Sequence, residues 1–167
     1  MLFDRSKSCL VVIDVQQYFL DKLPLDWRAP LVQRIAWLMR LAAALDIPVI
    51  ATAEDIANDG PLVPDLAKEL RPGAIVHDKM IFGLAGQLPI LDDVRRQGRD
   101  ECVLVGLETD VCIAQSAIGL MQEGFRVAVI EDATASPPPH HEAGLRRVAG
   151  AGGVITNCKG IHYEWVR

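Results

Sequence analysis

The chain has 167 residues, of which 50% are hydrophobic and 23% are charged, and its mean hydropathy is +0.20. Such a chain can bury a proper core, which excludes disordered and fibrous proteins. The formal net charge is −5 and the basic residues are scattered, so no basic face for nucleic acid is expected. No apolar run approaches the ~20 residues that span a bilayer, and the N-terminus lacks a signal-peptide pattern. We therefore expect one cytoplasmic domain over residues 1–167 that binds neither nucleic acid nor membrane.

The four cysteines are widely spaced along the chain, and none of them forms a CxxC pair or a Cys/His cluster at zinc spacing. Cys9 and Cys102 lie inside apolar runs, where a cysteine usually acts as a small buried hydrophobic residue. The cysteine pattern therefore favours neither a disulfide framework nor a structural zinc site.

Six short apolar runs predict buried strands. Each has nearly continuous rather than alternating apolar character, which is typical of strands covered on both faces. The runs are Cys9–Ile13, Pro48–Ala51, Ala74–Val76, Cys102–Val105, Val127–Ile130 and Gly153–Thr156.

Segments with helical spacing lie between these runs. Pro30–Leu45 carries apolar residues at helical intervals, and its proline suits a first helical turn. The polar stretch 52–72 predicts a loop with one short helix, Asp65–Leu70. Because strands and helices alternate, we expect an α/β fold with one parallel sheet between two helix layers. The other predicted helices are Leu84–Gln97, Asp110–Gln122 and His140–Ala149.

Polar side chains follow the carboxyl ends of the predicted strands, where parallel α/β sheets bind their ligands. Asp14 follows the first strand, Lys79 comes shortly after the third, and Cys112 follows the fourth. We therefore expect a carboxylate, an amine and a thiol to meet at one edge of the sheet.

These three groups together would make an activated nucleophile. Cys112 lies near the start of a predicted helix, whose positive end lowers the pKa of a thiol, and a nearby Lys79 ammonium acts in the same direction. A carboxylate such as Asp14 can take the thiol proton and return it to a leaving group. The combination suits acyl transfer, although each residue alone is also compatible with a turn, a solvated lysine or a structural cysteine.

Three segments carry a family resemblance. They are LVVIDVQQYF (Leu10–Phe19), DKMIFG (Asp78–Gly83) and GLETDVCIAQSAIGLMQEGFRVAVIEDATAS (Gly106–Ser136). The chain resembles the isochorismatase-like cysteine hydrolases, which include isochorismatases, nicotinamidases, N-carbamoylsarcosine amidohydrolases and ureidoacrylate hydrolases. The last segment is the most specific of the three, because its G-x-x-T-D-x-C pattern leads into a helix and an E-D-A run.

The resemblance implies a fold and roles for named residues. The fold is a Rossmann-like, six-stranded parallel sheet between helix layers. Asp14 would be the general base, Lys79 the catalytic lysine and Cys112 the nucleophile. The peptide bond between Leu107 and Glu108 would be cis, and the backbone N–H groups of Glu108 and Cys112 would form the oxyanion hole.

The resemblance also bears on the substrate pocket and on metals. Phe19 matches a pocket aromatic of amidase members, and Phe82 is a second pocket candidate. Nicotinamidases hold a metal through histidines after the second strand, whereas Thr52–Asp59 contains none. We expect Glu54 and Asp55 to lie on a solvated loop, and we expect no metal and no cofactor. The implied activity is hydrolysis of a small amide or a related C–N bond through a thioester.

Two other functions stay open at this point. One is vinyl-ether hydrolysis of the isochorismatase type, in which Asp14 acts as general acid and the thiol is dispensable. The other is a non-catalytic binding protein on the same fold. In each case we expect a homo-oligomer, a dimer or a tetramer, because the mean hydropathy is positive and the tail carries Tyr163 and Trp165.

Overall fold

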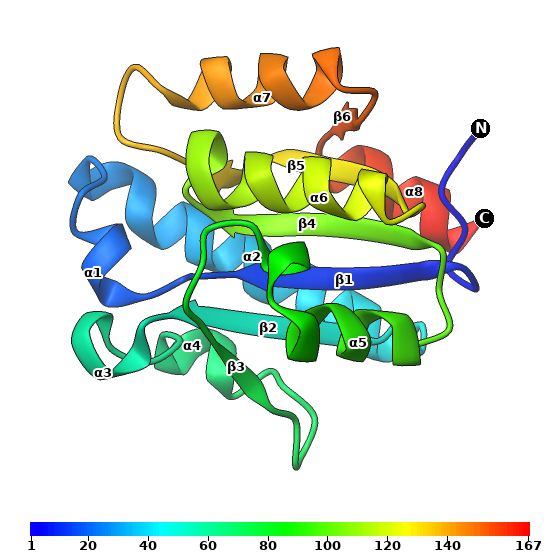
Figure 1. The fold of residues 1–167 in the computed structure, drawn as a ribbon, viewed down its shortest axis with the longest axis horizontal. Coiled ribbons are helices and arrows are strands. Elements are labelled where there is room, and N and C mark those ends of the chain that lie inside the picture. Colours follow the sequence, from blue (N-terminus) through cyan, green and yellow to red (C-terminus); the bar gives the residue numbers. More distant parts are fainter.

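The computed structural model describes all 167 residues and is built around one six-stranded sheet. Every pair of neighbouring strands is parallel, and the spatial order is β3-β2-β1-β4-β5-β6 (Figure 1). The expected fold class is confirmed. The strands are β1 (Ser8–Ile13), β2 (Val49–Glu54), β3 (Val76–Lys79), β4 (Glu101–Leu107), β5 (Arg126–Ala135) and β6 (Val154–Thr156).

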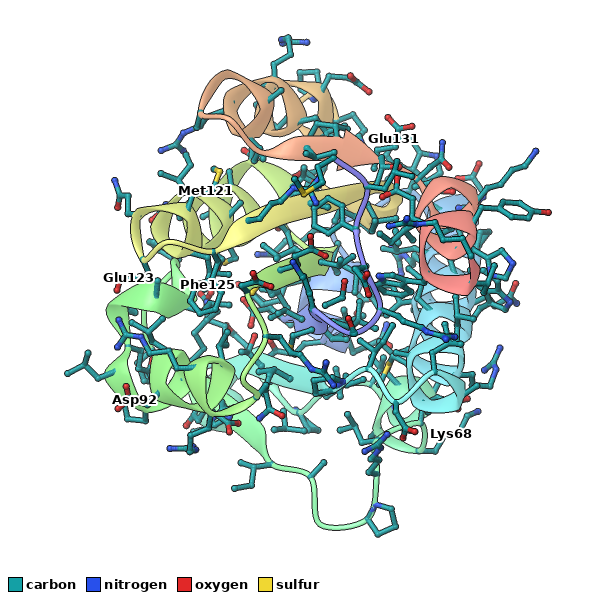
Figure 2. The ribbon with its side chains drawn as sticks, turned by 90° about the vertical axis from the view of Figure 1, so that its right-hand side faces the viewer. Lys68, Asp92, Met121, Glu123, Phe125 and Glu131 are labelled. Atoms are coloured by element: carbon teal, nitrogen blue, oxygen red, sulfur yellow. The ribbon has the colours of Figure 1, made fainter.

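Helices cover both faces of this sheet, and Figure 2 shows the two layers from the amino-terminal ends of the strands. One layer contains α2 (Leu25–Ala44), α4 (Pro64–Ala67) and α8 (Cys158–Val166). The other contains α5 (Leu88–Arg96), α6 (Ala114–Gln122) and α7 (His141–Gly150). The short helices α1 (Gln17–Leu20) and α3 (Ile56–Asp59) lie at the opposite, carboxyl edge of the sheet (Figure 1). No helix has both the length and the apolar character needed to cross a membrane.

The central strand β1 shows why the apolar runs are continuous. Leu10 and Val12 pack with the layer of α2 and α8, whereas Val11 and Ile13 pack with the layer of α5 and α6. Successive side chains of a strand point to opposite faces, so a strand between two helix layers needs apolar residues at every position. All six residues of β1 are buried as a result.

Several element bounds differ from those expected. Strand β2 continues to Glu54 because its last residues pair with β3, which itself begins at Val76 rather than Ala74. Helix α2 begins at Leu25, so Pro30 lies inside the helix and not in its first turn. The single helix predicted over Leu84–Gln97 is a short 3-10 turn, η1 (Leu84–Gly86), followed by α5.

The C-terminal tail forms helix α8, which the apolar pattern did not predict. Trp165 is fully buried, and its indole Nε1 donates a hydrogen bond to Ser8 Oγ at 3.0 Å. Tyr163, on the same helix, is 62% exposed. Trp165 therefore packs against the body of the protein, whereas Tyr163 lies on its surface.

Candidate active site

Asp14 is held at the carboxyl end of β1 by its backbone and by a threonine. Its φ of 52° lies in the left-handed region, which is uncommon for residues other than glycine but tolerated by aspartate. Its N–H donates to Thr52 O at 3.1 Å, and Thr52 Oγ1 donates to its carboxylate Oδ1 at 2.8 Å. The side chain is completely buried.

Lys79 is the last residue of β3 and carries its ammonium into the interior. Nζ lies 2.9 Å from Asp14 Oδ2, 2.9 Å from Glu54 Oε2 and 2.9 Å from the carbonyl oxygen of Ile81. Burial disfavours the charged ammonium, but Asp14, Cys112 and Glu54 outweigh this effect and raise the pKa of Lys79. The amine is therefore a stable cation, because its charge is paired within the protein.

Cys112 lies beside that cation on the turn η2 (Thr109–Ile113), which has π-helical hydrogen bonding and leads into α6. Its Sγ is 3.6 Å from Lys79 Nζ and donates to Glu54 Oε2 at 3.1 Å. Burial and the Asp14 charge raise the pKa of the thiol well above its usual range, although Lys79 acts in the opposite direction. The expectation of a lowered pKa was therefore wrong, because burial and the neighbouring carboxylates favour the protonated thiol.

A close approach between β1 and β4 brings the Cys112 loop to Asp14. Gly106, with φ 122°, leaves no room for a side chain, because a Cβ there would clash with the carbonyl of Ile13. The next peptide bond but one, Leu107–Glu108, is cis, as the resemblance implied. Because Gly106 is paired with Ile13 at the end of β1, the loop that carries Cys112 starts directly beside that end.

Glu54 is the site residue that the sequence did not identify. It is paired with Lys79 across β2 and β3, and it is not part of a solvated loop. The amide of Gln16 holds its backbone on both sides, since Glu54 N–H donates to Gln16 Oε1 at 2.7 Å and Gln16 Nε2 donates to Glu54 O at 2.7 Å. Strand β2 therefore directs its final carboxylate at both the ammonium and the thiol.

Ligand atoms of Asp14, Glu54 and Cys112 lie within 4.8 Å of one another, a spacing at which such groups can hold a cation. Lys79 Nζ contacts all three side chains, at 2.9 Å for each carboxylate and 3.6 Å for the sulfur. A positive charge therefore already lies among these three groups.

A cavity of about 320 Å³ opens onto Cys112. Phe19, which is mostly buried, and Phe82, which is 52% exposed, both line it, so the two expected aromatic residues lie at the cavity. Asp14 and Lys79 have no exposed side-chain surface and do not line the cavity. The remaining lining residues are Tyr18, Lys22, Glu54, Asp59, Glu108 and Val111.

The Glu108 side chain gives this cavity a polar wall. Its Oε1 is buried without a hydrogen-bond partner and lies 3.8 Å from Lys22 Nζ. Burial raises the pKa of the Glu108 carboxyl, although the Lys22 charge acts against this. The Lys22 ammonium also lies 4.2 Å from the centre of the Tyr18 ring. A bound molecule would therefore meet both aromatic surface and hydrogen-bonding groups.

Comparison with known sequences places the chain in a family. The model of the isochorismatase domain matches residues 8–159. The secreted isochorismatase effector Isc1 of Phytophthora sojae is 28% identical over 94% of this chain and 76% of its own length. Isochorismatase domain-containing protein 2 of Pongo abelii is 30% identical over 96% of this chain and 76% of its own length.

Solved structures share the fold. YcaC from Pseudomonas aeruginosa, with hexane-2,5-diol and covalent acrylamide, has a TM-score of 0.88 and 23% identity over 98% of this chain and 82% of its own. The YcaC gene product of Escherichia coli, an octameric hydrolase of unknown specificity, has a TM-score of 0.89 and 21% identity, covering 99% and 82%. A cysteine hydrolase from Pseudomonas syringae has a TM-score of 0.83 and 18% identity, covering 98% and 94%. The chain belongs to the isochorismatase family and has the fold of its cysteine hydrolases.

Proposed function

We propose that this protein hydrolyses a small amide or a related C–N bond, with Cys112 as nucleophile, Asp14 as general base and Lys79 as the cation between them. One observation carries the proposal. A buried ammonium lies 2.9 Å from Asp14 and 3.6 Å from the Cys112 sulfur, and the sulfur faces a cavity. Burying the charged groups of Asp14 and Lys79 costs solvation free energy that their pairing only partly offsets. Such a buried pair next to a cavity is therefore a candidate for a functional role.

The reaction would proceed through a thioester. The thiol hydrogen turns from Glu54 to Asp14, which is also within its hydrogen-bonding reach and takes the proton as Cys112 attacks the carbonyl carbon. The backbone N–H groups of Glu108 and Cys112 stabilise the oxyanion. The protonated Asp14 then gives its proton to the departing nitrogen, the C–N bond breaks, and water hydrolyses the thioester. The raised pKa of Cys112 fits this sequence of events, because a resting thiol needs a base at the moment of attack.

The cavity suits a small molecule as substrate. A volume of about 320 Å³ lies at the lower end of ligand pockets. Phe19 and Phe82 offer flat apolar contacts, and Glu108 offers a buried oxygen that can accept a hydrogen bond from the substrate or donate one to it. The Pseudomonas aeruginosa relative carries covalent acrylamide, which is itself a small amide.

Self-association and cellular location stay predictions. The octameric relative from Escherichia coli supports assembly of this chain with copies of itself, for which we expect a dimer or a tetramer. The cytoplasmic location expected from the sequence is likewise untested, and the relative from Phytophthora sojae is a secreted protein.

The proposal is tested with a panel of small amides and carbamoyl compounds. We expect wild-type protein to release amine or ammonia from at least one of them, and Cys112→Ala and Asp14→Asn to lose this turnover. Wild-type rates in both variants would remove the mechanism. Isochorismate turnover that survives Cys112→Ala but requires Asp14 would favour the vinyl-ether reaction instead.

A further inference from the structure

The site holds two carboxylates, and they occupy different positions. Asp14 has no exposed surface, whereas Glu54 is 17% exposed by its side chain and lines the cavity with Cys112. Both carboxylates contact Lys79 at 2.9 Å. A water molecule that enters the cavity therefore meets the Glu54 carboxylate first, because Glu54 lines the cavity and Asp14 does not.

The partner of Glu54 changes during the proposed reaction. In the resting protein, Glu54 Oε2 accepts a hydrogen bond from the Cys112 thiol at 3.1 Å. Thioester formation removes the S–H donor, so this oxygen is left beside the acylated sulfur with an unused acceptor site. A water molecule that donates a hydrogen bond to this oxygen would be held beside the acylated sulfur, where a carboxylate can act as its general base.

We propose that Glu54 is the general base of the second half of the reaction, the hydrolysis of the thioester on Cys112. The inference rests on the proposed function and adds a second acid–base residue to it. Asp14 serves the attack of the sulfur and the departure of the nitrogen, and Glu54 serves the water.

The proposed step balances in atoms and charge. Glu54 takes a proton from the water as the water oxygen forms a bond to the thioester carbon. The C–S bond then breaks, the sulfur leaves as thiolate, and the protonated Glu54 returns the proton to it. The products are the free carboxylic acid and the original Cys112 thiol, hydrogen-bonded to Glu54 as before.

The backbone geometry supports a fixed position for this base. Glu54 ends a strand, is paired with Lys79 in the adjacent strand, and is held on both sides by the buried Gln16 amide. Its carboxylate is therefore oriented by regular structure and by an ion pair before any substrate arrives.

The experiment uses p-nitrophenyl acetate, whose leaving group departs without needing a proton from Asp14. Acetylation and deacetylation of Cys112 can then be measured separately. Nitrophenolate release reports acetylation, and intact-mass measurement with peptide mapping reports the acetyl group on Cys112 over time. The variants are Glu54→Gln and Glu54→Ala. Asp55→Asn, at a neighbouring carboxylate that contacts Asn58 and does not line the cavity, is the matched control.

We expect Glu54→Gln to acetylate at least as fast as the wild type, because it loses a negative charge beside the sulfur, and to deacetylate ~100-fold more slowly or worse. Formate should restore deacetylation in Glu54→Ala by supplying a carboxylate, and Asp55→Asn should match the wild type. Deacetylation of Glu54→Gln within about threefold of the wild-type rate, or an equal loss in both steps, would overturn the proposal. Failure of formate to restore Glu54→Ala would also count against it. Absence of both nitrophenolate release and Cys112 acetylation in the wild type and in Glu54→Gln would contradict the proposed function itself, and this inference with it.

Discussion

Glu54 and Lys79 contact each other both through their backbones and through their side chains. They are paired positions at the ends of the parallel strands β2 and β3, and their side chains form an ion pair with Oε2 and Nζ 2.9 Å apart. Strand pairing thus places the Lys79 ammonium near the sulfur of Cys112. Cys112 lies on η2, which follows β4, and β4 is on the other side of β1 from β2. The strand order has its switch point between β1 and β4, where open parallel sheets form their ligand crevices.

Asp14→Asn should change thiol reactivity and hydrolysis in opposite directions. The Asp14 charge helps to raise the pKa of Cys112, so its removal lowers that pKa and increases the thiolate fraction below it. We expect alkylation by iodoacetamide at about pH 8 to become at least tenfold faster, since a neighbouring charge shifts a pKa by roughly one unit or more. Amide hydrolysis should fall by ~100-fold or more, because the base is lost. Slower alkylation in the variant would contradict this electrostatic picture.

Lys79→Met should slow alkylation and destabilise the fold. It removes the only group among the main causes that lowers the pKa of Cys112, so the thiolate fraction at a given pH falls. It also leaves the buried Asp14 carboxylate without its cation, a change that costs about 3–5 kcal/mol of unfolding free energy. Urea unfolding and iodoacetamide kinetics measure the two effects.

A surface lysine provides the control for that variant. Lys68, labelled in Figure 2, pairs with Asp65 on the exposed side of the molecule. Lys68→Met should change the unfolding free energy by less than about 1 kcal/mol and leave alkylation unchanged. Equal effects of Lys68→Met and Lys79→Met would show that the buried cation has no special role.

Two aromatic residues of helix α8 should differ sharply in their effect on stability. Trp165 is fully buried and bonded to Ser8, so Trp165→Ala should cost about 3–5 kcal/mol of unfolding free energy. Tyr163 is 62% exposed, so Tyr163→Ala should change the unfolding free energy of the monomer by less than about 0.5 kcal/mol. A larger loss for Tyr163→Ala that depends on protein concentration would place Tyr163 in a subunit interface.

The sheet and the three reactive groups follow from local sequence patterns. The continuous apolar runs indicate strands buried on both faces, and the carboxyl ends of parallel strands share one edge, so Asp14, Lys79 and Cys112 were expected together. The structure brings them together through Lys79, which contacts both of the others. The prediction succeeded because the spacing of apolar residues and the order of the strands can both be read from short segments of sequence.

Glu54 and the state of the thiol depend on tertiary structure. The run VIATAE contains small and polar residues, so only its pairing with β3 reveals that the strand extends to Glu54. The direction of the Cys112 pKa shift depends on burial and on two carboxylates from other strands, which outweigh Lys79. No local sequence pattern shows how close these carboxylates lie to the sulfur. A signal was nevertheless present, because an acid at the end of a possible strand is a candidate for the same edge of the sheet.

The most direct test of the account is to trap the reaction of an amide from the panel that the wild-type protein hydrolyses. Acid quenching during turnover, followed by peptide mapping, should find the acyl group of that amide on the Cys112 sulfur, and the Cys112→Ala variant should carry none. An acyl group trapped on a residue other than Cys112, or undiminished turnover by Cys112→Ala, would contradict covalent catalysis by this thiol.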